Sequence, residues 1–231
     1  MGEMTEIARP DGGRVPVYAA HPQSGGSAPG IVVVQEWWGL IDEIKGRADA
    51  LAACGFRAVV PDLFRGRKAA VGGEANHLME GLNFQDAFSQ DVRGALLHLK
   101  NDGAKAGVLG YCMGGALALL AAMHVPEDDA SVVFYGMPPA QAGDPGAIKI
   151  PVQLHFGTAD EFYARDAVER LEGNLKAGGV PYEMHWYEGA GHGFCNPNQP
   201  GESGLGNYDG KAARLAWERT VAFLTRTLSP R

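Results

Sequence analysis

Residues 110–115 read Gly-Tyr-Cys-Met-Gly-Gly and place one cysteine between glycines. Apolar runs at 105–109 and 116–122 flank this segment. The pattern G-x-C-x-G is typical of a tight turn from a buried strand into a helix, with small residues leaving room for the crossing backbone. The N–H groups and the positive dipole end of such a helix stabilise a thiolate. Cys112 is therefore a candidate nucleophile, and the alternative is a small cysteine buried at a helix start.

Two further residues fit a nucleophile of this kind in chain order. Asp160 follows an apolar β-rich run at 151–156, and His192 lies in a glycine-rich segment after a second run at 182–187. The order nucleophile, acid, histidine is the one that this strand–turn–helix arrangement uses. Taken singly, Asp160 fits a helix cap near 163 and His192 fits polar surface. Together, each beyond its own strand, they predict a Cys112–Asp160–His192 triad.

Backbone donors for an oxyanion are expected at two places. The N–H of Met113 opens the helix after the nucleophile and is the natural first donor. The segment Gln-Glu-Trp-Trp-Gly at 35–39 follows the apolar run 31–34, where the N–H of Trp37 would be the second. Glu36 beside a thiolate opposes it by charge repulsion. Its carboxylate could instead accept a hydrogen bond from the neutral thiol, or pair with an arginine.

Strand-like and helix-like patterns alternate along the chain, which indicates an α/β protein with a mostly parallel sheet and helices on both faces. We expect a single domain over residues 1–231 and two loops, 62–76 and 193–206, at the rim of the site. Strands are predicted at 15–18, 31–34, 56–60, 105–109, 131–135, 151–156 and 182–187. Helices are predicted at 41–53, 83–100, 113–123, 163–177 and 207–226.

The composition excludes several classes of partner. Hydrophobic residues make up 45% of the 231 residues, and the formal charge of -7 argues against nucleic-acid and anionic-membrane binding. The sequence has neither an apolar run long enough to span a bilayer nor a signal pattern. Three cysteines without regular spacing indicate free thiols in a reducing cytoplasm. Metal-ligand spacings such as CxxC and HExxH are missing, so we expect no metal. We also expect no cofactor, and a monomer because nothing in the sequence suggests an obligate interface.

Five segments, QEWWGL, PDLF, GYCMGG, HFGTAD and HWYEGAGHGF, resemble in this order the dienelactone hydrolases, the carboxymethylenebutenolidase-like enzymes. The resemblance runs from about residue 10 to 226. It implies an α/β-hydrolase fold, a Cys112–Asp160–His192 triad and a gating role for Glu36, whose carboxylate the substrate would displace. It also implies that Tyr135 lines the substrate pocket, and we expect Trp37, Trp38, Phe194 and Asn196 beside it.

The sequence departs from the family at the residues that hold an anionic substrate. Dienelactone hydrolases have an arginine four residues after the triad histidine, where this chain has Asn196, and a second arginine near 70–80, where this chain reads VGGEANHLMEG. Arg65 and Arg67 lie nearby without matching. We therefore predict a cysteine-dependent hydrolase of lactones or activated esters that forms an acyl-thioester. The alternatives are an esterase or thioesterase for less anionic substrates, a non-catalytic binding protein, and a redox sensor using Cys112 and Cys195.

Overall fold

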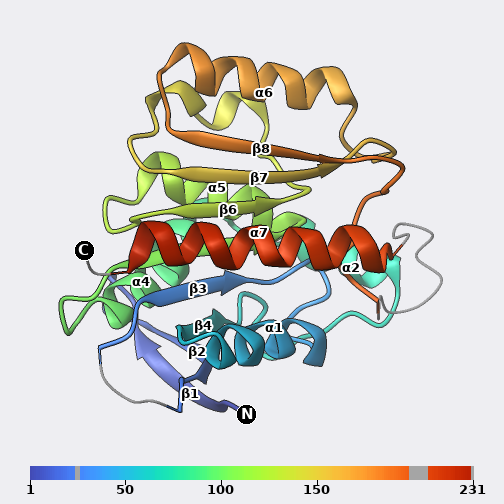
Figure 1. Ribbon diagram of the computed structural model, residues 1–231. Coiled ribbons are helices and arrows are strands. Elements are labelled where there is room, and N and C mark those ends of the chain that lie inside the picture. The colour runs from blue at the N-terminus through green and yellow to red at the C-terminus, as the bar shows by residue number, and fades with distance from the viewer. Residues whose placement is uncertain (24–26, 198–207, 230–231) are drawn as a thin grey trace.

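One twisted sheet of eight strands forms the centre of the computed structural model, which describes residues 1–23, 27–197 and 208–229 (Figure 1). The strand order is β1-β2-β4-β3-β5-β6-β7-β8. β1 and β2 are antiparallel to their neighbours, and the other six strands run parallel. The strands are β1 Glu3–Ala8, β2 Arg14–Ala20, β3 Gly30–Val34, β4 Arg57–Pro61, β5 Ala106–Tyr111, β6 Ser131–Phe134, β7 Val152–Gly157 and β8 Tyr182–Tyr187.

Helices cover both faces of the sheet. In Figure 1, α1 and α7 lie in front of it and α4 and α5 behind it, while α6 packs on the α5 side through the turn Pro145–Ala147. The central strands β3, β5 and β6 are buried throughout, as expected for strands covered twice. The helices are α1 Asp42–Ala53, α2 Gly72–Glu80, α3 Phe84–Asp86, α4 Arg93–Leu99, α5 Met113–His124, α6 Arg165–Ala177 and α7 Gly210–Leu228.

The register of the parallel strands brings their carboxyl ends to one edge of the sheet. Val34 pairs with Gly110, Tyr111 with Phe134, and Gly157 with Tyr187. The segments that follow β3, β5, β6, β7 and β8 therefore emerge side by side, although they lie far apart in the sequence. This edge is where ligands bind in open α/β sheets.

The β5–α5 turn passes very close to the neighbouring strand ends. A Cβ atom on Gly110 would lie 1.8 Å from the carbonyl oxygen of Gly114, and one on Gly114 would lie 2.3 Å from that of Val34. No side chain fits at such distances, so the two glycines of the G-x-C-x-G pattern are required by backbone packing.

Three elements differ from the sequence prediction. β1 was not expected, because its segment EMTEIA alternates weakly and buries only Ile7. The predicted loop 62–76 contains the start of α2. The predicted helix 83–100 is α3 and α4 joined by a π-helical turn, Ala87–Val92. The second predicted loop, 193–206, lies outside the described residues from 198 onward.

The described helices were also compared with the length and hydropathy that a bilayer requires. Within residues 1–23, 27–197 and 208–229, none of them is both long and apolar enough to cross a membrane.

Replacing Gly114 with alanine should destabilise the fold by about 2–4 kcal/mol, because the new Cβ forces backbone atoms of β3 and α5 apart. Gly173→Ala is the matched control, since Gly173 is exposed on α6 with open space around its Cα. This control should gain about 0.5–1 kcal/mol from helix propensity. Urea denaturation of both variants gives the comparison. Equal and small effects would contradict the close crossing.

Candidate active site

Cys112 lies at the turn between β5 and α5 with a backbone conformation that L-residues rarely adopt. Its φ is 54° and its ψ is -117°, and its side chain is half-buried. Strain of this kind costs about 1–3 kcal/mol and persists only where the surrounding packing imposes it. Here the glycine crossings on both sides impose it. The turn lifts the thiol out of the sheet edge and above the N-terminus of α5.

His192 and Asp160 lie next to Cys112, as the sequence predicts. His192 Nε2 is 3.1 Å from Cys112 Sγ, and His192 Nδ1 is 3.0 Å from Asp160 Oδ2. Both the imidazole and the carboxylate are buried. The contacts join the segments after β5, β7 and β8 into one hydrogen-bonded chain of side chains.

Asp160 also has a structural task. Its Oδ1 accepts hydrogen bonds from the backbone N–H groups of Phe162 and Tyr163 at 2.8 and 3.1 Å. The alternative of a helix cap is therefore partly right, although the bonds close a turn before α6 rather than capping α6 itself, whose N-cap is Ala164. One carboxylate thus orients the imidazole with one oxygen and its own loop with the other.

The environment of His192 favours the imidazolium. Burial by itself lowers the pKa of His192, but hydrogen bonds to Asp160 and Cys112, together with their charges, outweigh it and raise the pKa to about 10. The rings of Phe162 and Tyr135 pack around the imidazole, with centroids 4.6 and 5.2 Å away. Near neutral pH the ring therefore carries a proton on both nitrogens.

Glu36 lies at the same edge and is held by two donors. The hydroxyl of Tyr135 donates to Glu36 Oε1 at 3.2 Å, and the Asn196 amide donates to Oε2. Burial raises the pKa of Glu36, and these hydrogen bonds partly offset that rise. An ion pair with an arginine, the alternative considered for Glu36, does not hold this carboxylate, because the nearby Arg47 forms its ion pair with Glu43 at 2.8 Å. The carboxylate is thus directed to Tyr135 and Asn196 while the thiol contacts His192.

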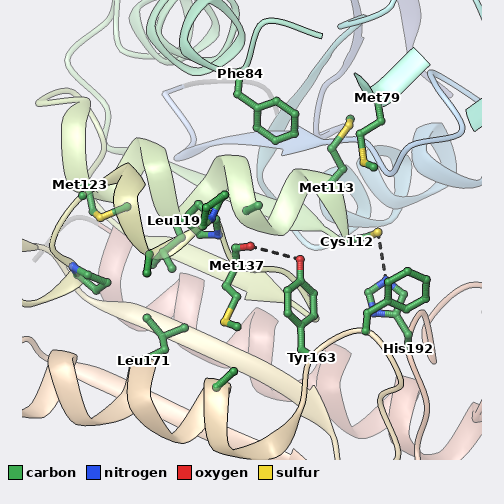
Figure 2. Close-up of a pocket in the computed structure, with 18 of the residues that line it drawn as sticks. Met79, Phe84, Cys112, Met113, Leu119, Met123, Met137, Tyr163, Leu171 and His192 are labelled. Atoms are coloured by element: carbon green, nitrogen blue, oxygen red, sulfur yellow. Dashed lines mark hydrogen bonds between the residues drawn. The ribbon is translucent and has the colours of Figure 1, made fainter. Parts of the chain in front are cut away.

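A cavity of about 820 Å³ opens onto Cys112 and His192 (Figure 2). Most of its wall is apolar, and its volume lies toward the upper end of the ~300–1,000 Å³ usual for small-molecule sites. Trp37 and Trp38 line it near the nucleophile, with their rings in an edge-to-face contact at 5.3 Å. Met113 also lines it, so the two residues whose N–H groups are the expected oxyanion donors both border the cavity.

The predicted pocket needs one correction. Tyr135 and Asn196 line a separate, water-sized cavity behind Glu36, and Phe194 is fully buried against Tyr135 and Tyr187. Tyr135, the first residue after β6, has a φ of 36° and is almost fully buried. These three side chains therefore support Glu36 and the His192 loop, whereas Trp37 and Trp38 border the large cavity.

The two arginines near the predicted rim also point elsewhere. Arg65 forms a bidentate ion pair with the buried Asp91 at 2.8 and 2.9 Å, and Arg67 donates to the carbonyl of Phe64. Neither lines the large cavity, so neither takes the place of the arginines found in dienelactone hydrolases.

The other two cysteines do not form a second reactive centre with Cys112. All three thiols are free. Burial raises the pKa of Cys195, which keeps that thiol protonated and poorly reactive. Within the described ranges, three or more His, Cys, Asp or Glu side chains do not gather in a way that could hold a metal ion.

Sequence reasoning missed Arg47 and most of the cavity wall. Arg47 reaches from α1 to the carbonyl of Cys195, and its guanidinium lies over the Tyr111 ring at 5.5 Å, so it ties α1 to the His192 loop. No spacing rule finds such a long-range contact. The apolar residues of α5 at 113, 116, 119 and 123 do recur with helical spacing, but in a helix buried on nearly all sides that pattern does not single out a cavity.

The strand order and the position of Cys112 at the β5–α5 turn are those of the α/β-hydrolase fold. The chain belongs to the dienelactone hydrolase family, whose model matches residues 15–228, and it is accordingly a hydrolase.

Individual relatives agree with this assignment. Protein usf of Aquifex pyrophilus is 34% identical over 99% of this chain and 100% of its own length. The carboxymethylenebutenolidase of Rhodococcus opacus is 31% identical over 94% of this chain and 89% of its own. A crystal structure of a dienelactone hydrolase-like promiscuous phosphotriesterase from metagenomic libraries is 25% identical, covers 99% of both chains and superposes with a TM-score of 0.86.

The imidazole of His192 should titrate near pH 10, and Asp160→Asn should move its midpoint to lower pH. The sign follows because the Asp160 carboxylate stabilises the protonated ring, so its loss favours deprotonation. NMR of the labelled histidine ring measures the midpoint without requiring turnover. Asp166→Asn, which removes an exposed carboxylate paired with Arg170, should leave the midpoint unchanged. An unshifted midpoint in Asp160→Asn would count against the Asp160–His192 pairing.

Proposed function

We propose that this protein is a cysteine-dependent carboxylic ester hydrolase that cleaves lactones or activated esters through an acyl-thioester on Cys112. The single observation that carries the proposal is the 3.1 Å contact between Cys112 Sγ and His192 Nε2, with Asp160 behind the imidazole at 3.0 Å. A nucleophile within reach of a base, and a base oriented by a third group, is the arrangement that covalent catalysis requires.

In the acylation step, the thiolate of Cys112 attacks the carbonyl carbon and forms a C–S bond. The oxyanion accepts hydrogen bonds from the N–H groups of Met113 and Trp37, each contributing about 3 kcal/mol. The C–O bond to the leaving group then breaks, and the protonated Nε2 of His192 gives its proton to the departing oxygen. In a lactone the departing oxygen stays tethered to the acyl group.

In the deacylation step, His192 acts as a base. Acylation removes the negative charge of Cys112, which is one of the causes of the raised pKa of His192. The pKa of the imidazole therefore falls once the thioester has formed, and the neutral ring can take a proton from water. The resulting hydroxide attacks the thioester carbonyl, the C–S bond breaks, and the carboxylic acid leaves. Asp160 keeps the ring in the tautomer that both steps need.

The charges around the cavity favour substrates less anionic than dienelactone. Arg65 and Arg67 are engaged outside the cavity, and Asn196, at the family's arginine position, bonds Glu36. Arg170 does line the cavity, but it forms an ion pair with Asp166 at 2.6 Å. A thiolate is also a good leaving group, so it suits carbonyls with activated leaving groups better than amides. Uncharged lactones, aryl esters and thioesters meet both conditions.

Glu36 has the position of a gate. While Tyr135 and Asn196 hold its carboxylate, the thiol remains free to contact His192. In the closed arrangement the carboxylate would accept a hydrogen bond from the Cys112 S–H group, which keeps its proton, so the thiol stays neutral. A substrate entering beside Trp37 would displace the carboxylate and release the thiol.

The wild-type enzyme should hydrolyse p-nitrophenyl acetate with a burst of p-nitrophenolate, and Cys112→Ala should lower kcat/KM by roughly a thousandfold or more, because the nucleophile is removed. Dienelactone, measured beside it, should give a lower kcat/KM than the aryl ester. Cys54→Ala is the matched control, since Cys54 is exposed and outside the cavity. Equal turnover by Cys112→Ala and wild type would overturn the proposal and favour a binding protein.

The gate has its own test. In Tyr135→Phe/Asn196→Ala, Glu36 loses both donors. Its carboxylate is then free to accept a hydrogen bond from the neutral Cys112 thiol and hold it protonated, so iodoacetamide should alkylate Cys112 several-fold more slowly at pH 7. Adding Glu36→Ala to this variant should restore the rate. All proteins would carry Cys54→Ser, because Cys54 is exposed. Faster alkylation in the double variant, or no recovery in the triple variant, would rule the gate out.

A further inference from the structure

The large cavity is much longer than the reaction centre at its end. It begins at Cys112 and His192 and continues along α5 as far as Met123, and Figure 2 shows these groups at opposite ends of the view. A small lactone at the thiol would leave most of the 820 Å³ unfilled. The remaining length therefore calls for a further part of the substrate.

One face of α5 forms the first wall. Met113, Ala116, Leu119 and Met123 all line the cavity, and their spacing puts them in a row along the helix. Met123 lies eleven positions after Cys112, and at 1.5 Å per residue the row is about 16 Å long. An extended carbon chain advances about 1.2 Å per bond, so ten to twelve carbons span about 11–13 Å and fit within this row.

A face of α6 and the segment after β6 form the opposite wall. Ala167 and Leu171 line the cavity from α6, and Met137 lines it from the segment after β6. Met79 and Phe84 close it from the α2–α3 side, as Figure 2 shows. Four of the seven methionines border the cavity, namely Met79, Met113, Met123 and Met137. Thioether side chains adapt to flexible apolar ligands, which favours a linear chain over a rigid ring system.

The charged residues along the arm have partners of their own. Arg170 forms an ion pair with Asp166 at 2.6 Å, and Asp144 accepts a hydrogen bond from the N–H of Gly146 at 2.8 Å. Asp144 follows Gly143, which packs against Met123 and His124 at the end of the cavity remote from Cys112. Arg170 lies beside Leu171 on α6, and its side chain is 68% exposed. The middle of the arm is lined by Ala116, Leu119 and Leu171, which offer only apolar contact.

The position of His192 decides which part of an ester enters the arm. His192 Nε2 must reach the leaving oxygen, so the leaving group lies on the His192 side of Cys112, beside the exposed ring of Phe162. The acyl group then extends from the carbonyl in the other direction, along α5. In Figure 2 the row from Met113 to Met123 leads away from His192.

We propose that the substrate's acyl group is a linear aliphatic chain of about ten to twelve carbons, which lies in the arm between α5 and α6 with its carbonyl at Cys112. This inference rests on the proposed cysteine-dependent hydrolysis and narrows its substrate class to medium-chain acyl esters, acyl thioesters or alkyl-substituted lactones.

The experiment measures kcat/KM for p-nitrophenyl esters from acetate to palmitate, each below its micelle concentration. The expected profile rises by roughly two- to fourfold per methylene as the chain fills the arm and falls beyond about fourteen carbons. Met123→Trp, at the far end, should lower the laurate-to-butyrate ratio of kcat/KM at least tenfold. Ala167→Trp on the opposite wall should do the same. Met4→Trp, at an exposed position on β1, is the matched control and should keep the wild-type ratio.

The remaining outcomes distinguish failure of the acyl arm from failure of the proposed cysteine-dependent hydrolysis. A flat or falling profile that still depends on Cys112 would overturn the acyl arm and leave the hydrolase proposal intact. Unchanged ratios in both tryptophan variants would also overturn it. Turnover that survives in Cys112→Ala would instead overturn the function on which the arm rests. Competitive inhibition by alkyl trifluoromethyl ketones, which lack a leaving group, should tighten with chain length in wild type, and length-independent inhibition would contradict the arm.

A second series of substrates tests whether the effect of the arm depends on the leaving group. Decanoyl esters, decanoyl thioesters and an alkyl-substituted lactone with the same carbon count share the acyl chain and differ in the departing atom. The acyl arm predicts the same loss in Met123→Trp for all three, because the tryptophan obstructs the chain and not the leaving group. A loss confined to one of them would place the tryptophan's effect at the leaving group and refute the arm.

Discussion

The close backbone crossing at the β5–α5 turn is the constraint on which the site depends. Gly114 lets the turn pass within van der Waals reach of the β3 end, and Gly110 lets β5 approach the Gly114 carbonyl. Gly136 passes the carbonyl of Cys112 in the same way, since a Cβ there would lie 2.0 Å from it. These contacts fix the strained conformation of Cys112. A looser turn would relax the residue and lower the thiol toward the sheet, out of line with His192.

The parallel sheet then supplies the partners. Since the strands end at one edge, residues 36, 112, 160 and 192 converge without any long helix or loop having to carry them there. The buried contacts around them raise the pKa of His192 and of Glu36 by different means, a charged hydrogen-bond partner in the first case and desolvation in the second. The same edge therefore holds an imidazolium and a carboxylate, and both border the large cavity.

Much of this could be predicted from the sequence, for reasons that are local. The apolar runs and the glycines around Cys112 indicate the strands and the turn, and the order of Cys112, Asp160 and His192 indicates which segments meet. The edge strand β1 was missed because a strand that buries only Ile7 lacks the alternating pattern. The burial of Tyr135 outside the large cavity was missed, because residue spacing reports neither its φ of 36° nor the direction of its side chain. The cavity arises between helices that are distant in the sequence, so its shape could not be inferred from either one alone.

Asp160 uses each of its two carboxylate oxygens for a different contact, and this couples its loop to the imidazole. One oxygen holds the imidazole and the other holds the backbone of the loop that carries Phe162 and Tyr163. The backbone beside the Phe162 and Tyr163 rings and the imidazole of His192 are therefore held by the same carboxylate. Any displacement of the loop that carries Phe162 and Tyr163 therefore also shifts the carboxylate that orients the imidazole, so the loop and the ring are coupled through a single side chain.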